Sequence, residues 1–172
     1  MFRARIRHTA LLAALATPMV LAQPPSGAPP ATNQRARGPG LSLAVEAAQT
    51  AVARCNANGY QVTVLIVDSA GVPVVLLSEG APERTQTIAG RKAAASIRYN
   101  GSSGDITERA KTDAALAAEI KADPKIGVAG QGALLLTAHG ETVGAIAVSG
   151  APGGEKDEAC AQAAIDKVKD RL

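Results

Sequence analysis

Four short apolar runs, arranged as two pairs that each close on a turn, most constrain what this chain can fold into. Runs of aliphatic and β-branched residues of this length, interrupted by Gly, Asp or Ser, are typical of strands in hairpins. Two hairpins cannot build an all-parallel sheet, so the sequence predicts an antiparallel one. The four runs are residues 62–67, 72–78, 133–137 and 142–148, with turns at 68–71 and at His139-Gly140.

Stretches with helical spacing of apolar residues fill most of the remaining chain from residue 41. Ser42 can cap the first helix, Gly59 can end it, and Asp123-Pro124 can end the third. The order of elements is helix, hairpin, two helices, hairpin, helix, which predicts an α+β domain whose first and last helices cover one face of the sheet. The expected helices are residues 42–58, 85–99, 105–122 and 155–171.

The N-terminus has the pattern of a secretory signal peptide over residues 1–22. Three arginines (Arg3, Arg5, Arg7) precede an apolar stretch that is too short to cross a bilayer, and Val20-Leu21-Ala22 suits a signal peptidase. We expect cleavage after Ala22 and a periplasmic or secreted protein, the alternative being an uncleaved membrane anchor.

Export accounts for the basic charge of the chain. The 18 Lys and Arg exceed the 15 Asp and Glu by three, and those three are the arginines of the signal. The mature chain is therefore formally neutral. Residues 23–40 follow as a Pro-rich, disordered linker without large apolar side chains, so the folded domain is expected at 41–172.

Several functional classes are excluded by residue counts. The chain has no Trp and only three aromatic residues, Phe2, Tyr60 and Tyr99, so nucleic-acid binding by base stacking is not expected. After signal removal His139 is the one histidine, and a catalytic triad would have to use it at an exposed hairpin tip, where a solvated turn residue is the better interpretation. One histidine and two cysteines cannot build a metal site without an added carboxylate, so no structural or catalytic metal is expected. The glycines of 127–132 lack the Gly-Lys-Ser/Thr ending of a phosphate loop, so no nucleotide is expected.

Cys55 and Cys160 are the two cysteines, 105 residues apart on the apolar sides of the first and last helices. In an oxidising compartment a disulfide between them would pin these helices together. Two buried free thiols, or a functional thiol, remain alternatives at this point.

A cationic strip lies on the expected second helix. Arg91 and Arg98 are seven residues apart and share a face, with Lys92 and Tyr99 beside them and alanines keeping the helix slim. Such a strip could border a pocket for a carboxylate-bearing small molecule. A solvated basic face is the alternative.

The chain resembles the GlcG/HbpS family of haem-binding proteins over essentially all of residues 41–172. The segments that carry the resemblance are NGYQVTVLIVD (58–68), RKA (91–93) and VGAIAVSGAPGGEKDEACA (143–161). The resemblance implies a profilin-like or roadblock-like fold with a five-stranded antiparallel sheet, homo-oligomers, and binding of haem or a related tetrapyrrole.

Two departures from the family pattern affect the expected ligand. Ala95 stands where the family often has Thr, and Gly130-Gln131-Gly132 stands where it often has three glycines. An iron ligand is therefore hard to name, Tyr99 being a candidate and His139 a weaker one.

The propionates could instead be held by Arg91 and Lys92, with iron weakly ligated or not at all. The leading hypothesis is an exported, non-enzymatic tetrapyrrole-binding protein. The alternatives are an enzyme of haem degradation and an accessory protein of a membrane sensor.

Overall fold

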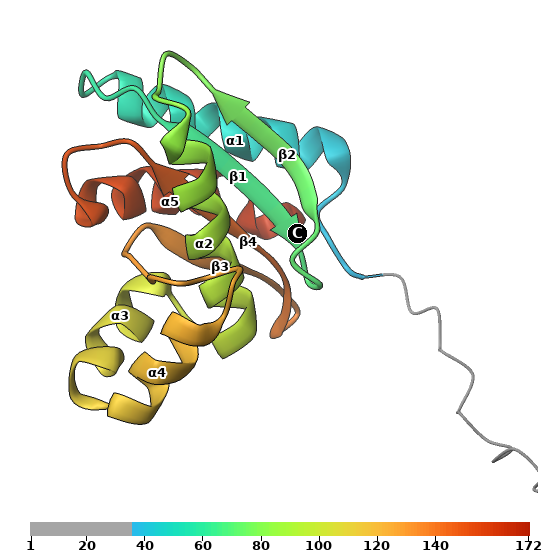
Figure 1. The fold of residues 1–172 in the computed structure, drawn as a ribbon. Coiled ribbons are helices and arrows are strands. Elements are labelled where there is room, and N and C mark those ends of the chain that lie inside the picture. The colour runs from blue at the N-terminus through green and yellow to red at the C-terminus, as the bar shows by residue number, and fades with distance from the viewer. Residues whose placement is uncertain (1–35) are drawn as a thin grey trace, which may run out of the picture. The chain divides into compact units, whose positions relative to one another are not determined.

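The computed structural model describes residues 36–172, and the fold is an antiparallel sheet between helices (Figure 1). The predicted signal peptide and most of the predicted linker lie outside the described residues. The elements are α1 (Leu41–Asn56), β1 (Thr63–Asp68), β2 (Pro73–Ser78), α2 (Arg84–Tyr99), α3 (Ser103–Thr112), α4 (Ala114–Ala122), β3 (Ala133–Ala138), β4 (Glu141–Ser149), α5 (Gly154–Val168) and a closing 3₁₀ turn (Lys169–Arg171).

The sheet has the strand order β2-β1-β4-β3, and every neighbouring pair is antiparallel. Both predicted hairpins are confirmed. In the second one, His139 (φ 50°) and Gly140 (φ 81°) form a two-residue turn with positive φ at both positions, which matches the twist of the strands. The fifth strand expected from the family resemblance is absent from residues 36–172, because the chain between the hairpins forms α2, α3, α4 and a glycine-containing loop, with no further β-branched run.

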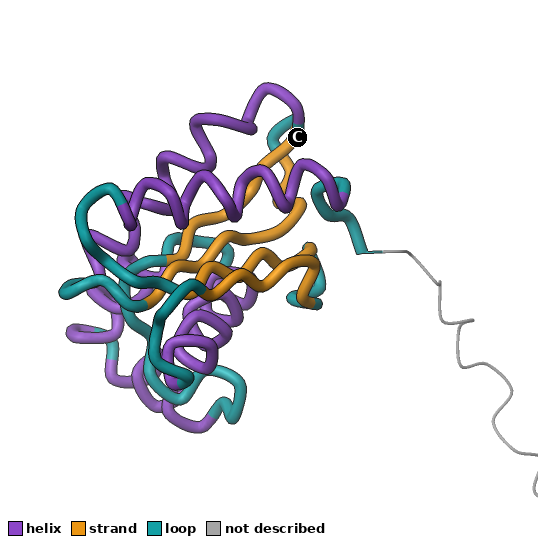
Figure 2. The backbone as a smooth tube through the Cα atoms, turned by 90° about the horizontal axis from the view of Figure 1, so that it is seen from above, coloured by secondary structure: helices purple, strands orange, loops and turns teal. Residues whose placement is uncertain are grey.

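Helices lie on both sides of the sheet (Figure 2), and the side chains of the strands alternate between these two helical layers. Val64 and Ile66 of β1 face α1 and α5, whereas Leu65 and Val67 face α2. The prediction that the first and last helices cover one face is therefore confirmed. A third apolar cluster, centred on Ile106 and Ile126, packs α3 and α4 against α2.

A disulfide joins Cys55 of α1 to Cys160 of α5, with their Cα atoms 5.6 Å apart. Both residues are buried, at 0% and 2% exposure. The sequence allowed a disulfide, two free thiols or a functional thiol, and the structure contains the disulfide.

Most helix boundaries lie within three residues of the prediction, and two differences concern helix starts. The first helix begins at Leu41 without a side-chain cap, so Ser42 lies inside it. The helix predicted over 105–122 is two helices, because the Asp113 side chain accepts the N–H of Leu116 at 3.0 Å and starts α4 there.

Residues 36–40 precede the predicted domain boundary at residue 41, yet they contact the folded domain. The N–H of Arg37 donates to Ser69 Oγ at 2.9 Å, and Ser69 N–H donates to the Arg37 carbonyl at 2.7 Å. The Arg37 side chain pairs with Glu141 of β4. Among the helices of residues 36–172, none combines the length and hydropathy needed to cross a bilayer.

Candidate functional site

Helix α2 positions the predicted site residues, and it presents them to different neighbours. Its buried side is made of small side chains and one lysine, which lets the helix lie close to the sheet. Residues three or four apart share a face, whereas adjacent residues diverge by about 100°. The buried set is Thr85, Ala89, Lys92, Ala93, Ala95 and Ser96.

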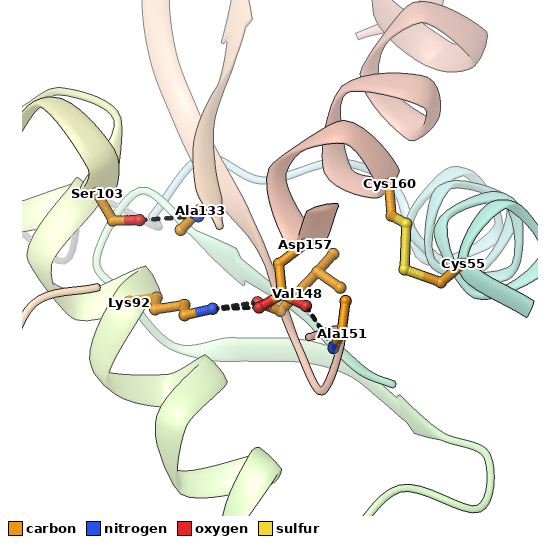
Figure 3. Close-up of polar contacts among 8 residues, drawn as sticks. All are labelled: Cys55, Lys92, Ser103, Ala133, Val148, Ala151, Asp157 and Cys160. Atoms are coloured by element: carbon orange, nitrogen blue, oxygen red, sulfur yellow. Dashed lines mark hydrogen bonds and ion pairs between the residues drawn. A yellow bond between two sulfur atoms is a disulfide. The ribbon is translucent and has the colours of Figure 1, made fainter. Parts of the chain in front are cut away.

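Lys92 lies in a buried ion pair that links three elements (Figure 3). Its Nζ is 2.7 Å from Asp157 Oδ2 of α5 and donates to the carbonyl of Val148 of β4 at 2.8 Å. The other carboxylate oxygen of Asp157 accepts the N–H of Ala151 at 2.9 Å. The two side chains are only 6% and 5% exposed, so the ammonium charge is neutralised inside the domain.

Burial raises the pKa of the Asp157 carboxyl, and the hydrogen bond and charge of Lys92 oppose that shift. Glycine is required beside the pair. Gly132 has φ +129°, and a Cβ there would lie 2.7 Å from Lys92 Nζ and 2.8 Å from the Val148 carbonyl oxygen. The backbone therefore approaches the ammonium more closely than any other residue would allow.

A small pocket of about 340 Å³ adjoins this ion pair. Segments that carry the family resemblance converge on it, including Lys92, Ser149-Gly150 and Gly153-Gly154. Lys92 and Asp157 neutralise each other's charge. Their ion pair is enough to hold these segments together, so the convergence of the segments does not by itself indicate a ligand site.

A mainly apolar cleft lies on the opposite side of α2, and we call it the α2 cleft. It has a volume of about 480 Å³, within the range of roughly 300–1,000 Å³ usual for ligand sites. Its floor is the α2-facing side of β1, and its walls are α2, the β1–β2 turn and the loop after α4. The lining residues are Leu65, Val67, Ala70, Gly71, Pro73, Gly90, Ala93, Ala94, Ile97, Arg98, Asp123, Lys125 and Ile126.

Two cations and one carboxylate line this otherwise apolar cleft. Arg98 Nη1 is 3.6 Å from Asp123 Oδ2, and the Arg98 side chain stays 54% exposed. Asp123 Oδ1 accepts the N–H of Lys125 at 2.8 Å, which orders the loop. The arrangement can bind an apolar molecule that carries carboxylates.

The other predicted site residues lie elsewhere. Arg91 is exposed, with its guanidinium near Gly127. Tyr99 packs against the cluster under α3 and α4, and its hydroxyl is buried with no hydrogen-bond partner among the described residues. His139 is exposed at the hairpin tip and lines neither of the clefts beside α2. The strip Arg91, Lys92, Arg98 and Tyr99 is therefore divided, and only Arg98 lines the α2 cleft.

Sequence reasoning missed Asp157, Asp123 and Lys125. A signal for the first was present, because Asp157 falls on the same helical stripe as Cys160, Ala161 and Ala164, and a lone charge on an apolar stripe indicates a buried partner. No comparable pattern marked Asp123 and Lys125, which lie in a loop.

A wider cleft of about 760 Å³ near Tyr60 and Arg84 is more open and has a more polar lining, including Glu79. It is less suited to an apolar ligand than the α2 cleft. Among the described residues, no group of three or more His, Cys, Asp or Glu side chains is placed to hold a metal ion.

A family described as "Haem degrading protein HbpS-like" matches residues 40–166 of the chain. Among solved structures, HbpS of Streptomyces reticuli, determined as a double mutant, is 29% identical with a TM-score of 0.71, covering 86% of this chain and 99% of that one. A second structure, of HbpS, is 28% identical with a TM-score of 0.69 and covers 90% and 99% of the two chains.

The fold is also similar to that of PduOC, solved as a haem complex, at 23% identity and a TM-score of 0.68, covering 75% of this chain and 94% of that one. No curated protein matches the sequence.

Proposed function

Because the chain belongs to the HbpS-like family, we propose that it is an exported protein that binds haem or a related tetrapyrrole in the α2 cleft. The observation that carries the proposal is the cleft itself, an apolar space of about 480 Å³ lined at one side by Arg98. A tetrapyrrole presents the matching chemistry, a flat apolar ring with carboxylates on one edge.

The walls of the cleft favour a flat ring because α2 is slim where it faces the space. Gly90 and Ala94 leave room beside the helix. The half-buried Ile97 and the exposed Pro73 supply apolar surface, whereas Leu65 and Val67 at the floor are only 4% and 2% exposed. Aliphatic walls stabilise an apolar ring by about 25 cal/mol for each Å² removed from water. The cleft supplies this burial without aromatic side chains.

Arg98 is the side chain we assign to a propionate, with Lys125 on the facing loop as a second cation. Arg98 is held by Asp123 at 3.6 Å, a distance at which the pair is loose enough to open. A propionate that displaced Asp123 would gain a charge-assisted contact with guanidinium.

Gly90 offers the sharpest test of the cleft. A Cβ at this position would meet no heavy atom within 4 Å, and leucine suits a helix interior better than glycine by roughly 0.5–1 kcal/mol. Gly90→Leu should therefore fill the cleft while leaving the fold at least as stable. We expect haemin binding, followed by the Soret band, to weaken at least about tenfold, whereas Gly90→Ala retains it.

A cation test follows from the same cleft. Arg98→Ala should weaken haemin binding about tenfold, because it removes one partly exposed charge-assisted contact. Arg54→Ala is the control, since Arg54 is exposed on α1, on the opposite face of the sheet. Unchanged affinity in both Gly90→Leu and Arg98→Ala would locate the site elsewhere.

Export is part of the proposal and is supported by the disulfide between Cys55 and Cys160, because disulfides persist in oxidising compartments. The expected mature N-terminus is Gln23. Mass spectrometry of the periplasmic or secreted protein tests this, and a chain that retains residues 1–22 would contradict it.

Haem degradation is a second candidate function, favoured by the description of the matching family. Incubating the haemin complex with oxygen and a reductant, then identifying products by chromatography, separates turnover from binding. A stable Soret band under these conditions would support binding alone.

A further inference from the structure

The side chains that line the α2 cleft are suited to a porphyrin ring and its carboxylates but not to iron. The side chains that most often hold haem iron in proteins are those of His, Cys, Met and Tyr. None of the residues that line the cleft is of these types. The polar side chains among them are Arg98, Asp123 and Lys125, and the first two already pair with each other at 3.6 Å.

The ligand-type residues elsewhere in the described chain do not line the cleft. Cys55 and Cys160 are bonded to each other. Tyr99 is next to the cleft, because the Arg98 guanidinium lies 5.6 Å from its ring centroid, but its hydroxyl is buried and the side chain packs into the cluster that contains Ile106. His139 is exposed at the tip of the β3–β4 hairpin. Tyr60 lines the wider cleft at the α2 N-terminal side.

The remaining histidine and both methionines precede residue 36 in the sequence. All three, His8, Met1 and Met19, belong to the predicted signal peptide, which cleavage after Ala22 would remove. A mature chain would therefore bring none of them to the cleft.

We infer that the α2 cleft recognises the dicarboxylic porphyrin itself rather than its iron, so that metal-free protoporphyrin IX and haemin bind alike. This inference rests on the proposed function. Affinity comes from burying the ring against the accessible apolar lining, Pro73, Ala94 and Ile97, and from pairing its propionates with Arg98 and Lys125. The iron of bound haemin keeps a coordination position that an added small ligand can take.

The test compares haemin with metal-free protoporphyrin IX on the mature, disulfide-bonded protein. Haemin is followed by its Soret band and protoporphyrin IX by its fluorescence. We expect dissociation constants within about tenfold of each other, both raised by Gly90→Leu and by Arg98→Ala. We also expect added imidazole to shift the Soret band of the wild-type haemin complex, and Tyr99→Phe and His139→Ala to leave that spectrum unchanged.

The outcomes separate the inference from the proposed function. Binding of haemin with protoporphyrin IX more than about tenfold weaker overturns the inference and leaves haem binding intact. A Soret band that changes in Tyr99→Phe or His139→Ala also overturns it, since either residue would then ligate iron, within the chain or from a second copy. If neither compound binds, the proposed function itself is wrong.

Discussion

Replacing Lys92 by methionine should destabilise the domain far more than the same replacement at Lys111. The two lysines make ion pairs of similar length, 2.7 Å to Asp157 and 2.6 Å to Glu108. They differ in burial, because the first pair is 6% and 5% exposed and the second 63% and 69%. Methionine removes the ammonium but keeps a similar apolar length.

The magnitude follows from what Lys92→Met leaves behind. The Asp157 carboxylate keeps only the N–H of Ala151, and the Val148 carbonyl loses its lysine donor. Removing one partner of a buried ion pair costs about 3–5 kcal/mol. For a domain of this size that corresponds to a decrease of roughly 10–20 °C in Tm. The exposed pair at Lys111 contributes about 0–1 kcal/mol.

The loss of unfolding free energy caused by Lys92→Met should also depend on pH. Lys92 lowers the pKa of Asp157 against the effect of burial, so its removal raises that pKa further above the unfolded value. An acid whose folded pKa is raised is most stable when protonated, and its stability falls as pH rises through the folded pKa. The difference in unfolding free energy between wild type and Lys92→Met should therefore be smaller at pH 4 than at pH 7.

Urea unfolding followed by circular dichroism measures these free energies. The double variant Lys92→Met with Asp157→Asn keeps an acceptor for Ala151 and removes both charges, so its cost should be less than the sum of the two single costs. Additive costs, or a Lys92→Met penalty no larger than that of Lys111→Met, would refute the assignment of this pair as the link between α2 and α5.

Three further predictions follow from other contacts. Reducing the disulfide between Cys55 and Cys160 should cost about 2–5 kcal/mol, because it closes a loop of 105 residues; urea unfolding with and without reductant measures this, and no change would contradict it. Gly132→Ala should destabilise by more than about 1 kcal/mol, since φ is +129° and a Cβ would meet Lys92; a Tm equal to wild type would argue against this geometry. Arg171 holds the pKa of Glu46 below its usual range, so the pair stabilises above pH 4.5 and its contribution disappears as pH falls through the lowered pKa; the stability difference between wild type and Glu46→Gln should shrink on acidification, and a constant difference would refute it.

The hairpins were predictable because their determinants are local. Asp68 Oδ1 accepts the N–H groups of Ala70 and Val72, both at 2.9 Å, within the turn that its own sequence neighbours form. At the other hairpin, His139 and Gly140 supply the positive φ values themselves. Turn chemistry of this kind needs no knowledge of the rest of the fold.

The errors arose where local signals were absent or ambiguous. Apolar periodicity continues through residues 105–122, so the break at Asp113 is visible only in the capping contact with Leu116. The fifth strand came from the family resemblance and had no run of residues in this chain to form it.

The site could be predicted only in part, because proximity along α2 does not determine proximity in space. Arg91, Lys92 and Arg98 were grouped as one cationic strip. In the fold, Arg91 is exposed. Lys92 pairs with Asp157, which lies 65 positions later in the sequence. Arg98 contacts Asp123 at the end of α4. Long-range partners of this kind leave no trace in the spacing of the helix itself.

The separation of these roles explains why α2 has four alanines and a glycine among its 16 residues. The same helix must approach β4 closely enough for Lys92 to reach the Val148 carbonyl, and it must leave an open space where Gly90 and Ala94 face the cleft. Larger side chains on the side of α2 that faces β4 would lengthen the 2.7 Å ion pair between Lys92 and Asp157. Larger side chains at Gly90 or Ala94 would fill the α2 cleft. A substitution at Gly90 should therefore change ligand binding without changing stability through Lys92, and a substitution at Lys92 should change stability first. Measuring both quantities in both variants distinguishes a helix with two independent faces from one in which the ion pair also shapes the binding cleft.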